Sequence, residues 1–350
     1  MALIPATILT GFLGSGKTTL LKRVLTETHG QKIAVIENEF GEENIDNEIL
    51  VNDTEEQIFQ MNNGCVCCTI REDLRNTLSL LAAKKRKGLL NFERVIIETT
   101  GLADPGPVAQ TFFIDEEVAE SYLLDAIVTL VDAKHAMQQL DDRQEARRQV
   151  GFADQLFISK ADLVTPDALD ALQHRLKHMN PRAPQQVVHF GQVPLEDVLD
   201  LRGFNLNAKL DVDPEFLTED EHDHDHDHEH GHDHAHNHDH GECHHPHHHH
   251  HDDDVKSFLY KTERPFDPAR LEDFLGAIVN IYGPRMLRYK GVLDMKGTDR
   301  KVIFQGVHQL MGSDLGPAWK ADEPRVSKMV FIGIDLPRDI LTQGLDQCLI

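Results

Sequence analysis

Short apolar runs alternate with amphipathic stretches along residues 1–202. Each run spans four to six residues rich in Val, Ile and Leu, as expected for a strand that is buried on both faces. The stretches between them repeat apolar residues at helical spacing, as residues 18–28 do. This alternation predicts a doubly wound, mostly parallel α/β sheet. The predicted strands are Pro5–Leu9, Lys32–Ile36, Arg94–Glu98, Ala126–Val131, Gln155–Ser159 and Gln186–His189.

The pattern changes twice after residue 202. Residues 203–254 contain few apolar positions, too few to offset the entropy lost on ordering, so we predict a disordered linker rich in His and Asp. Regular patterning returns over residues 255–350, where it predicts a small α+β domain with an antiparallel sheet. The strands predicted there are Val255–Thr262, Leu287–Met295, Lys301–Leu310 and Lys328–Asp335, and the helices are Pro268–Tyr282 and Pro337–Leu349.

Composition and charge restrict the class of protein. The chain has 350 residues, of which 40% are hydrophobic, and no apolar run reaches the roughly 18 residues of a membrane span. Residues 1–10 lack the basic region and the cleavage site of a signal peptide, so we expect a cytoplasmic protein. Sixteen acidic residues and no Lys or Arg lie between Asp211 and Asp254, so the net charge of −24 is largely local. We therefore expect neither nucleic acid nor a membrane as a partner.

One glycine-rich motif has the chemistry to bind phosphate. Residues 11–18 match the pattern G-x-x-x-x-G-K-[ST], with a predicted strand before it and a predicted helix after it. Glycines let backbone N–H groups turn toward phosphate oxygens, Lys17 supplies charge to the β- and γ-phosphates, and the Thr18 hydroxyl is a ligand for Mg²⁺. An ordinary glycine-rich turn is the alternative, which the Lys-Thr pair disfavours. The predicted phosphate-binding residues are Gly11, Gly14, Ser15, Gly16, Lys17, Thr18, Thr19 and Gly101.

Hydrolysis of a bound nucleotide calls for an acidic residue near the Mg²⁺. Glu98 ends a predicted apolar strand, and a carboxylate at the carboxyl end of a parallel strand points into the ligand crevice. We predict that Glu98 holds Mg²⁺ through water and that Gly101 presents its N–H to the γ-phosphate; the alternative is that Glu98 caps the following helix. Lys17, Thr18 and Glu98 are the predicted catalytic residues, and no residue is predicted to orient the attacking water.

A second motif indicates that the base is guanine. Residues 159–162, Ser-Lys-Ala-Asp, follow a predicted strand and match the [NTS]-K-x-D element of GTPases. The carboxylate of Asp162 can accept hydrogen bonds from both N1–H and N2–H₂ of guanine, a donor pair that adenine lacks, and the Lys160 stem can pack on the ring. A buried acceptor without a donor costs about 1–3 kcal/mol, so this residue would discriminate between the bases. Lys160 and Asp162 are the predicted guanine-binding residues.

Three of the five cysteines, Cys65, Cys67 and Cys68, lie within four positions. Thiols this close can converge on one Zn²⁺ or Cu(I) ion, with a fourth position left for another ligand. In a reducing compartment such a cluster favours metal binding over a disulfide framework. The alternatives are a redox-active dithiol and three inert, partly buried cysteines.

Seventeen of the 23 histidines lie between His222 and His251, first alternating with Asp or Glu and then consecutive. Neutral imidazoles bind Ni²⁺, Cu²⁺ and Zn²⁺, so this segment is a candidate auxiliary metal site; a solvated acidic linker is the alternative. Isolated histidines such as His174 and His189 are assigned no role. The predicted auxiliary ligands are His222, His224, His226, His228, His230, His232, His234, His236, His238 and His240.

Five motifs occur together in a fixed order: residues 11–19 (GFLGSGKTT), 37–42 (ENEFGE), 65–68 (CVCC), 98–101 (ETTG) and 159–162 (SKAD). With this order the chain resembles the CobW family of GTPase metallochaperones, especially its YjiA-like, zinc-transferring members. The resemblance extends to the C-terminal region, where residues 287–291 and 304–307 look like the small C-terminal domain of that family.

The resemblance implies a Ras-like P-loop fold with GTP, Mg²⁺ and Zn²⁺ as ligands, and delivery of metal to a client metalloprotein. It implies that Cys65, Cys67 and Cys68 bind zinc and that Glu37 and Glu42 lie near the metal in a nucleotide-sensing switch, although solvated loop carboxylates are the alternative for the two glutamates. Nickel- or cobalt-insertion GTPases and a metal buffer or storage protein remain alternative functions. The identity of the client and the oligomeric state, a homo-oligomer included, stay open.

Overall fold

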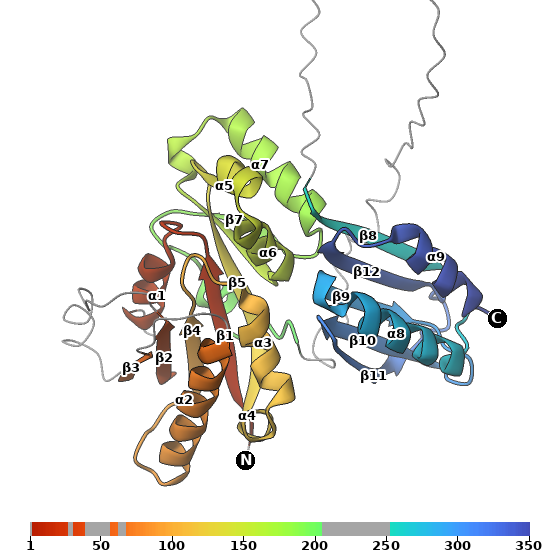
Figure 1. Cartoon of the computed structure of the whole chain (residues 1–350), viewed down its shortest axis with the longest axis horizontal. Helices are drawn as coiled ribbons and strands as arrows, with labels where there is room; N and C mark the ends of the chain where they lie inside the picture. Colours follow the sequence, from red (N-terminus) through yellow and green to blue (C-terminus); the bar gives the residue numbers. More distant parts are fainter. Residues whose placement is uncertain (1, 27–30, 39–56, 62–67, 205–252) are drawn as a thin grey trace, which may run out of the picture. The chain divides into compact units, whose positions relative to one another are not determined.

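The computed structural model describes residues 2–26, 31–38, 57–61, 68–204 and 253–350. It confirms the predicted fold class. A seven-stranded parallel sheet has helices on both faces, and a five-stranded antiparallel sheet carries two further helices (Figure 1). The strands of the parallel sheet, in the order in which they lie, are β3 (Gln57–Met61), β2 (Ile33–Asn38), β4 (Arg94–Glu98), β1 (Ile4–Gly11), β5 (Tyr122–Asp132), β6 (Gln155–Ser159) and β7 (Gln185–Val188).

Parallel pairing brings the carboxyl ends of these strands to one edge of the sheet. The chain builds β2 to β4 on one side of β1 and β5 to β7 on the other, so the order reverses at β1. A ligand crevice forms outside the strand ends at such a reversal. The loop after β1 therefore lies where this fold places its ligands. The helices of this part are α1 (Lys17–Thr26), α2 (Cys68–Arg86), α3 (Pro105–Ile114), α4 (Glu116–Ser121), α5 (Ala136–Asp142), α6 (Gln144–Phe152) and α7 (Pro166–Met179).

Helix α1 holds the crevice in place through one apolar face. Leu20, Leu21 and Val24 are fully buried and pack in one cluster with sheet residues such as Leu9 and Phe157. Full burial of such a side chain stabilises the fold by about 1.5–3 kcal/mol. The start of α1 is thereby fixed against the carboxyl end of β1.

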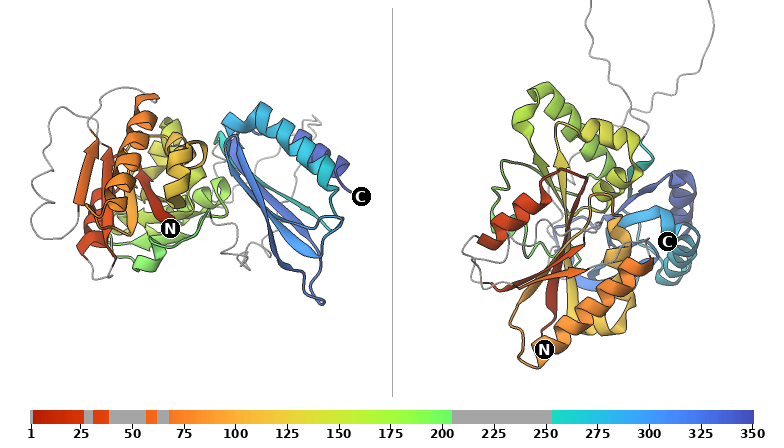
Figure 2. Two further views of the ribbon diagram at one scale, coloured as in Figure 1. Left: turned by 90° about the horizontal axis from the view of Figure 1, so that it is seen from below. Right: turned by 60° about the vertical axis from the view of Figure 1, so that its left-hand side comes forward.

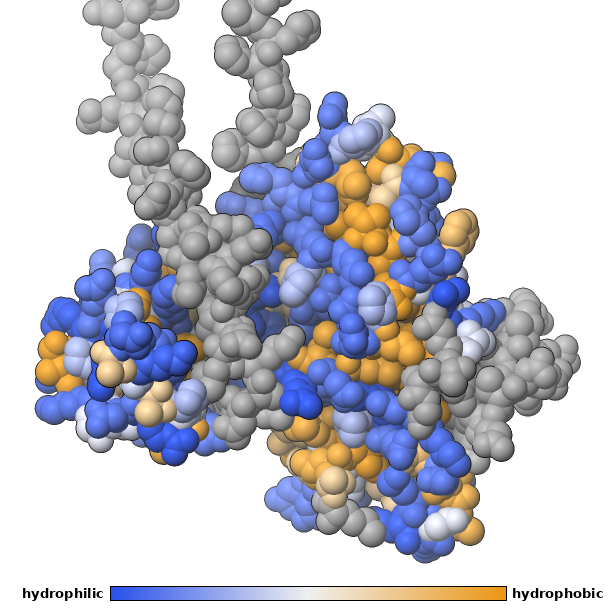
Figure 3. Space-filling model, turned by 180° about the vertical axis from the view of Figure 1, so that it is seen from behind, coloured by the Kyte–Doolittle hydropathy of each residue, from blue (hydrophilic) through white to orange (hydrophobic). Residues whose placement is uncertain are grey.

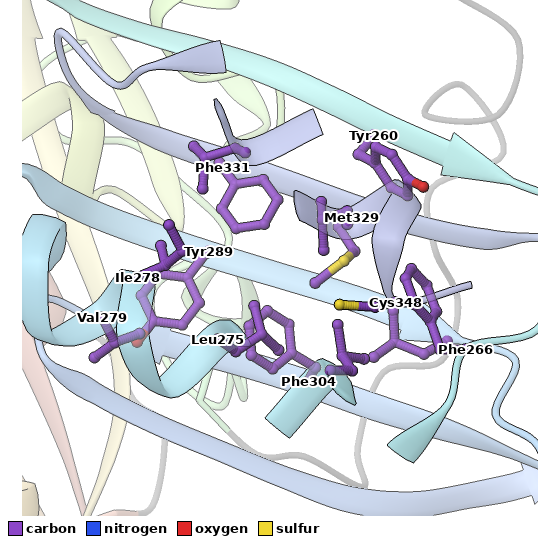
Figure 4. Packing of buried hydrophobic residues seen from close by; sticks show 14 of the residues in the cluster. Tyr260, Phe266, Leu275, Ile278, Val279, Tyr289, Phe304, Met329, Phe331 and Cys348 are labelled. Carbon is purple, nitrogen blue, oxygen red and sulfur yellow. The ribbon is translucent and has the colours of Figure 1, made fainter. Parts of the chain in front are cut away.

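The second sheet forms the C-terminal domain. Every neighbouring pair of its strands is antiparallel, and α8 (Pro268–Tyr282) and α9 (Arg338–Gln347) lie on the same face (Figure 2). Tyr289, Phe304 and Phe331 pack beneath these helices, with the Tyr289 ring centroid 5.3 Å from that of Phe304 (Figure 4). The strands, in the order in which they lie, are β11 (Leu310–Ala318), β10 (Arg300–Val307), β9 (Met286–Leu293), β12 (Ser327–Ile334) and β8 (Val255–Thr262).

The structure corrects the predicted strands at two edges. Strand β3 was not predicted, and the single strand predicted over Lys301–Leu310 is a hairpin of β10 and β11, with His308 at a positive φ of 51° in the turn. Both additional strands lie at the edge of a sheet, where pairing with one neighbour decides the conformation. The other predicted strands and the two C-terminal helices are confirmed.

Most of the predicted linker, residues 205–252, lies outside the described residues, as do Glu42, Cys65, Cys67 and the ten named histidines.

Hydrophilic residues cover much of the surface shown in Figure 3, with groups of hydrophobic residues between them. Large apolar side chains that are singly exposed, such as Leu89 and Ile281, are common on proteins. None of the described helices combines the length and apolar character that crossing a bilayer requires.

Candidate nucleotide and metal site

The loop between β1 and α1 has the backbone conformation of a phosphate cradle. Gly11, Gly14 and Gly16 have φ angles of 143°, 76° and 101°, which residues other than glycine rarely adopt. A Cβ atom on Gly11 would also lie 2.4 Å from the carbonyl oxygen of Leu130, so a side chain cannot fit there. The loop thus depends on glycine for both conformation and space, as the motif predicted.

The ammonium group of Lys17 lies over this loop. Its Nζ atom donates hydrogen bonds to the carbonyl oxygens of Gly11 at 2.8 Å and Phe12 at 3.4 Å. Burial lowers the pKa of Lys17, and the nearby carboxylate of Glu98 partly offsets that effect. A buried cation at the mouth of a glycine-rich loop is suited to a polyanionic ligand.

Thr18 and Glu98 meet beside the cradle. The Thr18 hydroxyl donates to the Glu98 Oε1 atom over 3.2 Å, which joins the start of α1 to the end of β4. The alternative role for Glu98, capping the next helix, is wrong, because Asp104 is the N-cap of α3 and accepts from the N–H of Gly106. A hydroxyl and a carboxylate oxygen this close are the hard ligands that Mg²⁺ prefers.

The segment after Glu98 packs directly on the phosphate loop. A Cβ atom on Gly101 would lie 2.6 Å from the backbone nitrogen of Leu13, so only glycine allows this approach. The buried side chain of Gln149 in α6 donates to the carbonyl oxygens of Gly101 at 3.2 Å and Ala103 at 2.9 Å. The helix thereby holds the segment that would sense a terminal phosphate.

Two buried hydroxyl groups beside the cradle have no hydrogen-bond partner among the described residues, those of Ser15 and Thr100. Buried polar groups are nearly always hydrogen-bonded, so an unpaired one needs an explanation. Both lie on segments already assigned to phosphate and Mg²⁺. Partners supplied by a nucleotide would satisfy them.

The guanine motif contacts the same loop. The Ser159 hydroxyl donates to the Ser15 carbonyl oxygen at 2.7 Å, and the Lys160 Nζ atom donates to the Gly14 carbonyl oxygen at 2.8 Å. Lys160 has a positive φ of 57°, which turns the chain so that Asp162 follows in a short 3₁₀ helix, Ala161–Leu163. The Asp162 side chain is half exposed, so it is accessible to a ligand.

Asp132, at the end of β5, fixes the position of Lys160. Its Oδ2 atom accepts from Lys160 Nζ at 2.7 Å and lies 2.9 Å from the Nδ1 atom of His135. Burial by itself raises the pKa of Asp132, but the hydrogen bonds from Lys160 and His135 outweigh it and hold that pKa below its usual value. The carboxylate is therefore charged at neutral pH.

The candidate metal residues are only partly described. Glu37 is buried near the end of β2 and is paired in register with Glu98 of β4 and Gln60 of β3. Cys68 is the first residue of α2, the helix that follows β3. Among the described residues no group of three or more His, Cys, Asp and Glu side chains could hold a metal ion. Of the predicted metal residues, Glu37 lies at the carboxyl end of its strand, on the edge of the sheet that also carries the glycine loop after β1.

Two family models match this chain. The model described as "CobW/HypB/UreG, nucleotide-binding domain" matches residues 5–187, and that of the CobW C-terminal domain matches residues 255–349. The chain belongs to the CobW family. Its two matched regions coincide with the parallel and the antiparallel sheet.

Relatives resemble this CobW protein over nearly its whole length. The zinc chaperone YjiA of Escherichia coli is 37% identical over 96% of each chain. The zinc-regulated GTPase metalloprotein activator 1 of Dictyostelium discoideum is 32% identical over 99% of this chain and 80% of its own. The zinc chaperone CobW of Pseudomonas aeruginosa is 32% identical over 99% of this chain and 91% of its own.

Solved structures agree with the sequence relatives. The Zn(II)-bound YjiA GTPase of E. coli superimposes with a TM-score of 0.74 at 31% identity, and both chains are covered completely. A Zn(II)-bound triple mutant of YjiA, in which one glutamate and two cysteines are replaced by alanine, gives a TM-score of 0.75 at 32% identity. The fold of this CobW protein is therefore that of YjiA.

Two residues at the site of this CobW protein were missed from the sequence. Asp132 ends an apolar strand just as Glu98 does, so the rule that selected Glu98 could have found it. Gln149 carried no comparable signal, since a glutamine inside a helical stretch is ordinarily solvated. His189, which was assigned no role, has its Nδ1 atom 3.8 Å from the Asp162 carboxylate.

Proposed function

We propose that this CobW-family protein is a GTP-hydrolysing metallochaperone that carries Zn²⁺ and transfers it to a client metalloprotein. We place it in the cytoplasm, with residues 1–202 as the GTPase domain, residues 203–254 as the metal-binding linker and residues 255–350 as the C-terminal domain. The zinc chaperones among its relatives support the choice of metal.

One observation carries the proposal: Thr18, Lys17 and Glu98 converge beside a glycine loop that the guanine motif also contacts. Phosphate, magnesium and base thus have neighbouring candidate partners in one crevice. Thr18 and Glu98 would hold Mg²⁺, which when bound neutralises charge on the β- and γ-phosphate oxygens. Lys17 would exchange its backbone carbonyl partners for phosphate oxygens.

The other residues would position the nucleotide. Asp132 holds the Lys160 stem against the phosphate loop, where its methylene groups can cover one face of the base. Asp162 would accept hydrogen bonds from the guanine edge. The Gly101 N–H would contact the γ-phosphate, and Gln149 would keep that segment seated on the loop.

Zinc would bind to Cys65, Cys67 and Cys68, with Glu37 and Glu42 near it and the histidine segment as an auxiliary collector. Glu37 and Cys68 are the members of this set that the structure describes, and the strand position of Glu37 beside Glu98 supports a cargo site next to the nucleotide site. Removal of the γ-phosphate would alter the segment after Glu98 and, through the neighbouring strand, the affinity for zinc.

The test measures phosphate release from GTP and from ATP, and Zn²⁺ release to a competing chelator dye, for the full chain and for Lys17→Ala. We expect GTP to be strongly preferred, zinc release to follow hydrolysis, and both to be lost in the variant. Equal rates with ATP, or zinc release that is unchanged in Lys17→Ala, would contradict the proposal. A parallel titration with Ni²⁺ distinguishes a nickel-insertion GTPase.

A further inference from the structure

Phe190 is the most exposed of the large apolar side chains in the described residues, with 84% of its surface accessible. It follows β7 in a tight turn, in which the N–H of Gln192 donates to the carbonyl oxygen of His189 at 2.9 Å. The two central residues, Phe190 and Gly191, have φ angles of 50° and 71°. Positive φ at both central positions is the pattern of a type I′ turn, which favours Asn-Gly.

Phenylalanine is a poor choice for this turn. A bulky side chain at positive φ is a conformational outlier, and strain of this kind persists where the surrounding structure requires it. The exposed ring of Phe190 gains little from burial, so packing does not explain why an aromatic residue stands there. A residue type that fits its backbone conformation poorly and gains nothing from packing indicates a functional role.

The turn lies between the guanine motif and the first turn of α1. On one side of Phe190, the Nδ1 atom of His189 lies 3.8 Å from the Oδ1 atom of Asp162. On the other side, the backbone of Gly191 packs on the first turn of α1, because a Cβ atom there would lie 3.0 Å from the Leu20 Cα and 3.2 Å from the Thr19 carbonyl oxygen. A guanine nucleotide with phosphates at the start of α1 and its base at Asp162 must span the same two elements.

We propose that the Phe190 ring stacks on the guanine base, on the side away from the Lys160 stem, and that His189 steadies the Asp162 carboxylate. This inference rests on the proposed guanine site. Every base has an aromatic face, and stacking is largely independent of hydrogen-bond pattern, so Phe190 would add affinity whereas Asp162 would add selectivity. A protein partner that docks on the exposed ring is the competing occupant.

The experiment measures GDP affinity by calorimetry for the full chain and for Phe190→Ala, Phe190→Tyr and Phe190→Gly. Loss of a stacking ring weakens binding roughly tenfold, so we expect that loss in Phe190→Ala and a change within about twofold in Phe190→Tyr. Because the ring contacts the base and not the γ-phosphate, kcat at saturating GTP should stay unchanged while KM rises. Leu89→Ala, at a site with 68% exposure away from the guanine motif, is the matched control and should bind GDP like the unaltered chain.

Phe190→Gly separates binding from folding. Glycine suits positive φ, so this variant should unfold at the same or a higher temperature than the unaltered chain while binding GDP more weakly. A second readout uses Phe190→Trp in a Trp319→Phe background, where Trp319 is the chain's one native tryptophan. GDP should quench the fluorescence of the new tryptophan.

Asp162→Asn distinguishes failure of this inference from failure of the guanine site. If that variant loses its preference for GDP over xanthosine diphosphate but Phe190→Ala binds GDP normally, the stacking role is overturned. A protein partner then remains as the candidate occupant of the exposed ring. If neither variant changes GDP affinity, the guanine site itself is wrong. If both lose affinity and Phe190→Tyr retains it, the inference holds.

Discussion

Glu37 and Glu98 occupy paired positions on the neighbouring parallel strands β2 and β4. Paired residues of adjacent strands project to the same face, about 5 Å apart at the backbone. Glu98 contacts the hydroxyl of Thr18, whereas Glu37 is the buried glutamate that the resemblance assigned to the metal site. This register links the proposed zinc site to the proposed magnesium site across one strand spacing.

Replacing Glu98 by Gln should reduce Mg²⁺-dependent GTP hydrolysis about 100-fold, because the amide keeps the size of the side chain but not its charge. Phosphate release at saturating GTP and Mg²⁺ is the measurement. Glu93→Gln, just before the start of β4, is the control and should hydrolyse GTP normally. Full activity in Glu98→Gln would remove this residue from the magnesium site.

Glu37→Gln should weaken Zn²⁺ binding by about tenfold or more, as loss of a carboxylate from a metal site or from its immediate surroundings does. Competition with a chromogenic chelator measures this. GDP affinity in the absence of zinc should not change, since Glu37 is on the far side of Glu98 from β1. Unaltered zinc affinity together with weaker GDP binding would place Glu37 in the nucleotide site instead.

Gln149→Leu should destabilise the fold by about 1–3 kcal/mol, because the carbonyl groups of Gly101 and Ala103 lose a buried donor. GTP hydrolysis should fall more than GDP affinity, since Gly101 is proposed to contact the γ-phosphate alone. Thermal unfolding and steady-state kinetics provide the two measurements. Gln144→Leu, at the exposed start of the same helix, is the control. Equal losses in hydrolysis and GDP affinity would refute the positioning role.

Asp132→Asn should weaken GDP binding about tenfold, because Lys160 loses a charged hydrogen-bond partner. The same variant has a defined pH signature. The pKa of Asp132 is lowered in the folded chain, so the unfolded chain binds more protons in acid and the stabilisation grows with pH. It is complete above the ordinary Asp pKa of about 4 and is lost as pH falls through the lowered value.

The melting temperature of the unaltered chain should therefore exceed that of Asp132→Asn at pH 7, and the difference should shrink below about pH 4. Thermal unfolding of both chains between pH 7 and pH 3 measures it. A difference that stays constant over this range would mean that the Asp132 charge does not stabilise the fold.

The sequence predicted those parts of the fold that have a strong local pattern. Runs such as Arg94–Glu98, which has three consecutive β-branched apolar residues between its charged ends, need no partner to be identified as strands. Strand β3, with Gln at both its first and its fourth position, and β11, with Gly, Pro and Asp inside it, take their conformation from a single neighbouring strand. Pairing of this kind is a tertiary property that no local window contains.

The residues of the candidate site fall into the same two groups, those with a local sequence pattern and those without one. Lys17, Thr18 and Asp162 belong to motifs with fixed spacing and could be predicted, whereas Gln149 and Phe190 come from a helix interior and a hairpin turn. Gln149 donates a hydrogen bond to Ala103, which is 46 residues away in the sequence. Phe190 is distinguished by its positive φ. Neither property can be read from residue types alone.

Zinc affinity in three nucleotide states tests the central claim most directly. The full chain would be titrated with Zn²⁺ against a competing chelator in the presence of a non-hydrolysable GTP analogue, of GDP and of no nucleotide, all with Mg²⁺. The account predicts that affinity with the analogue differs from affinity with GDP by at least about fivefold, and that zinc changes affinity for the analogue, relative to GDP, by the same factor. Three equal zinc affinities would show that the nucleotide and zinc sites are not coupled.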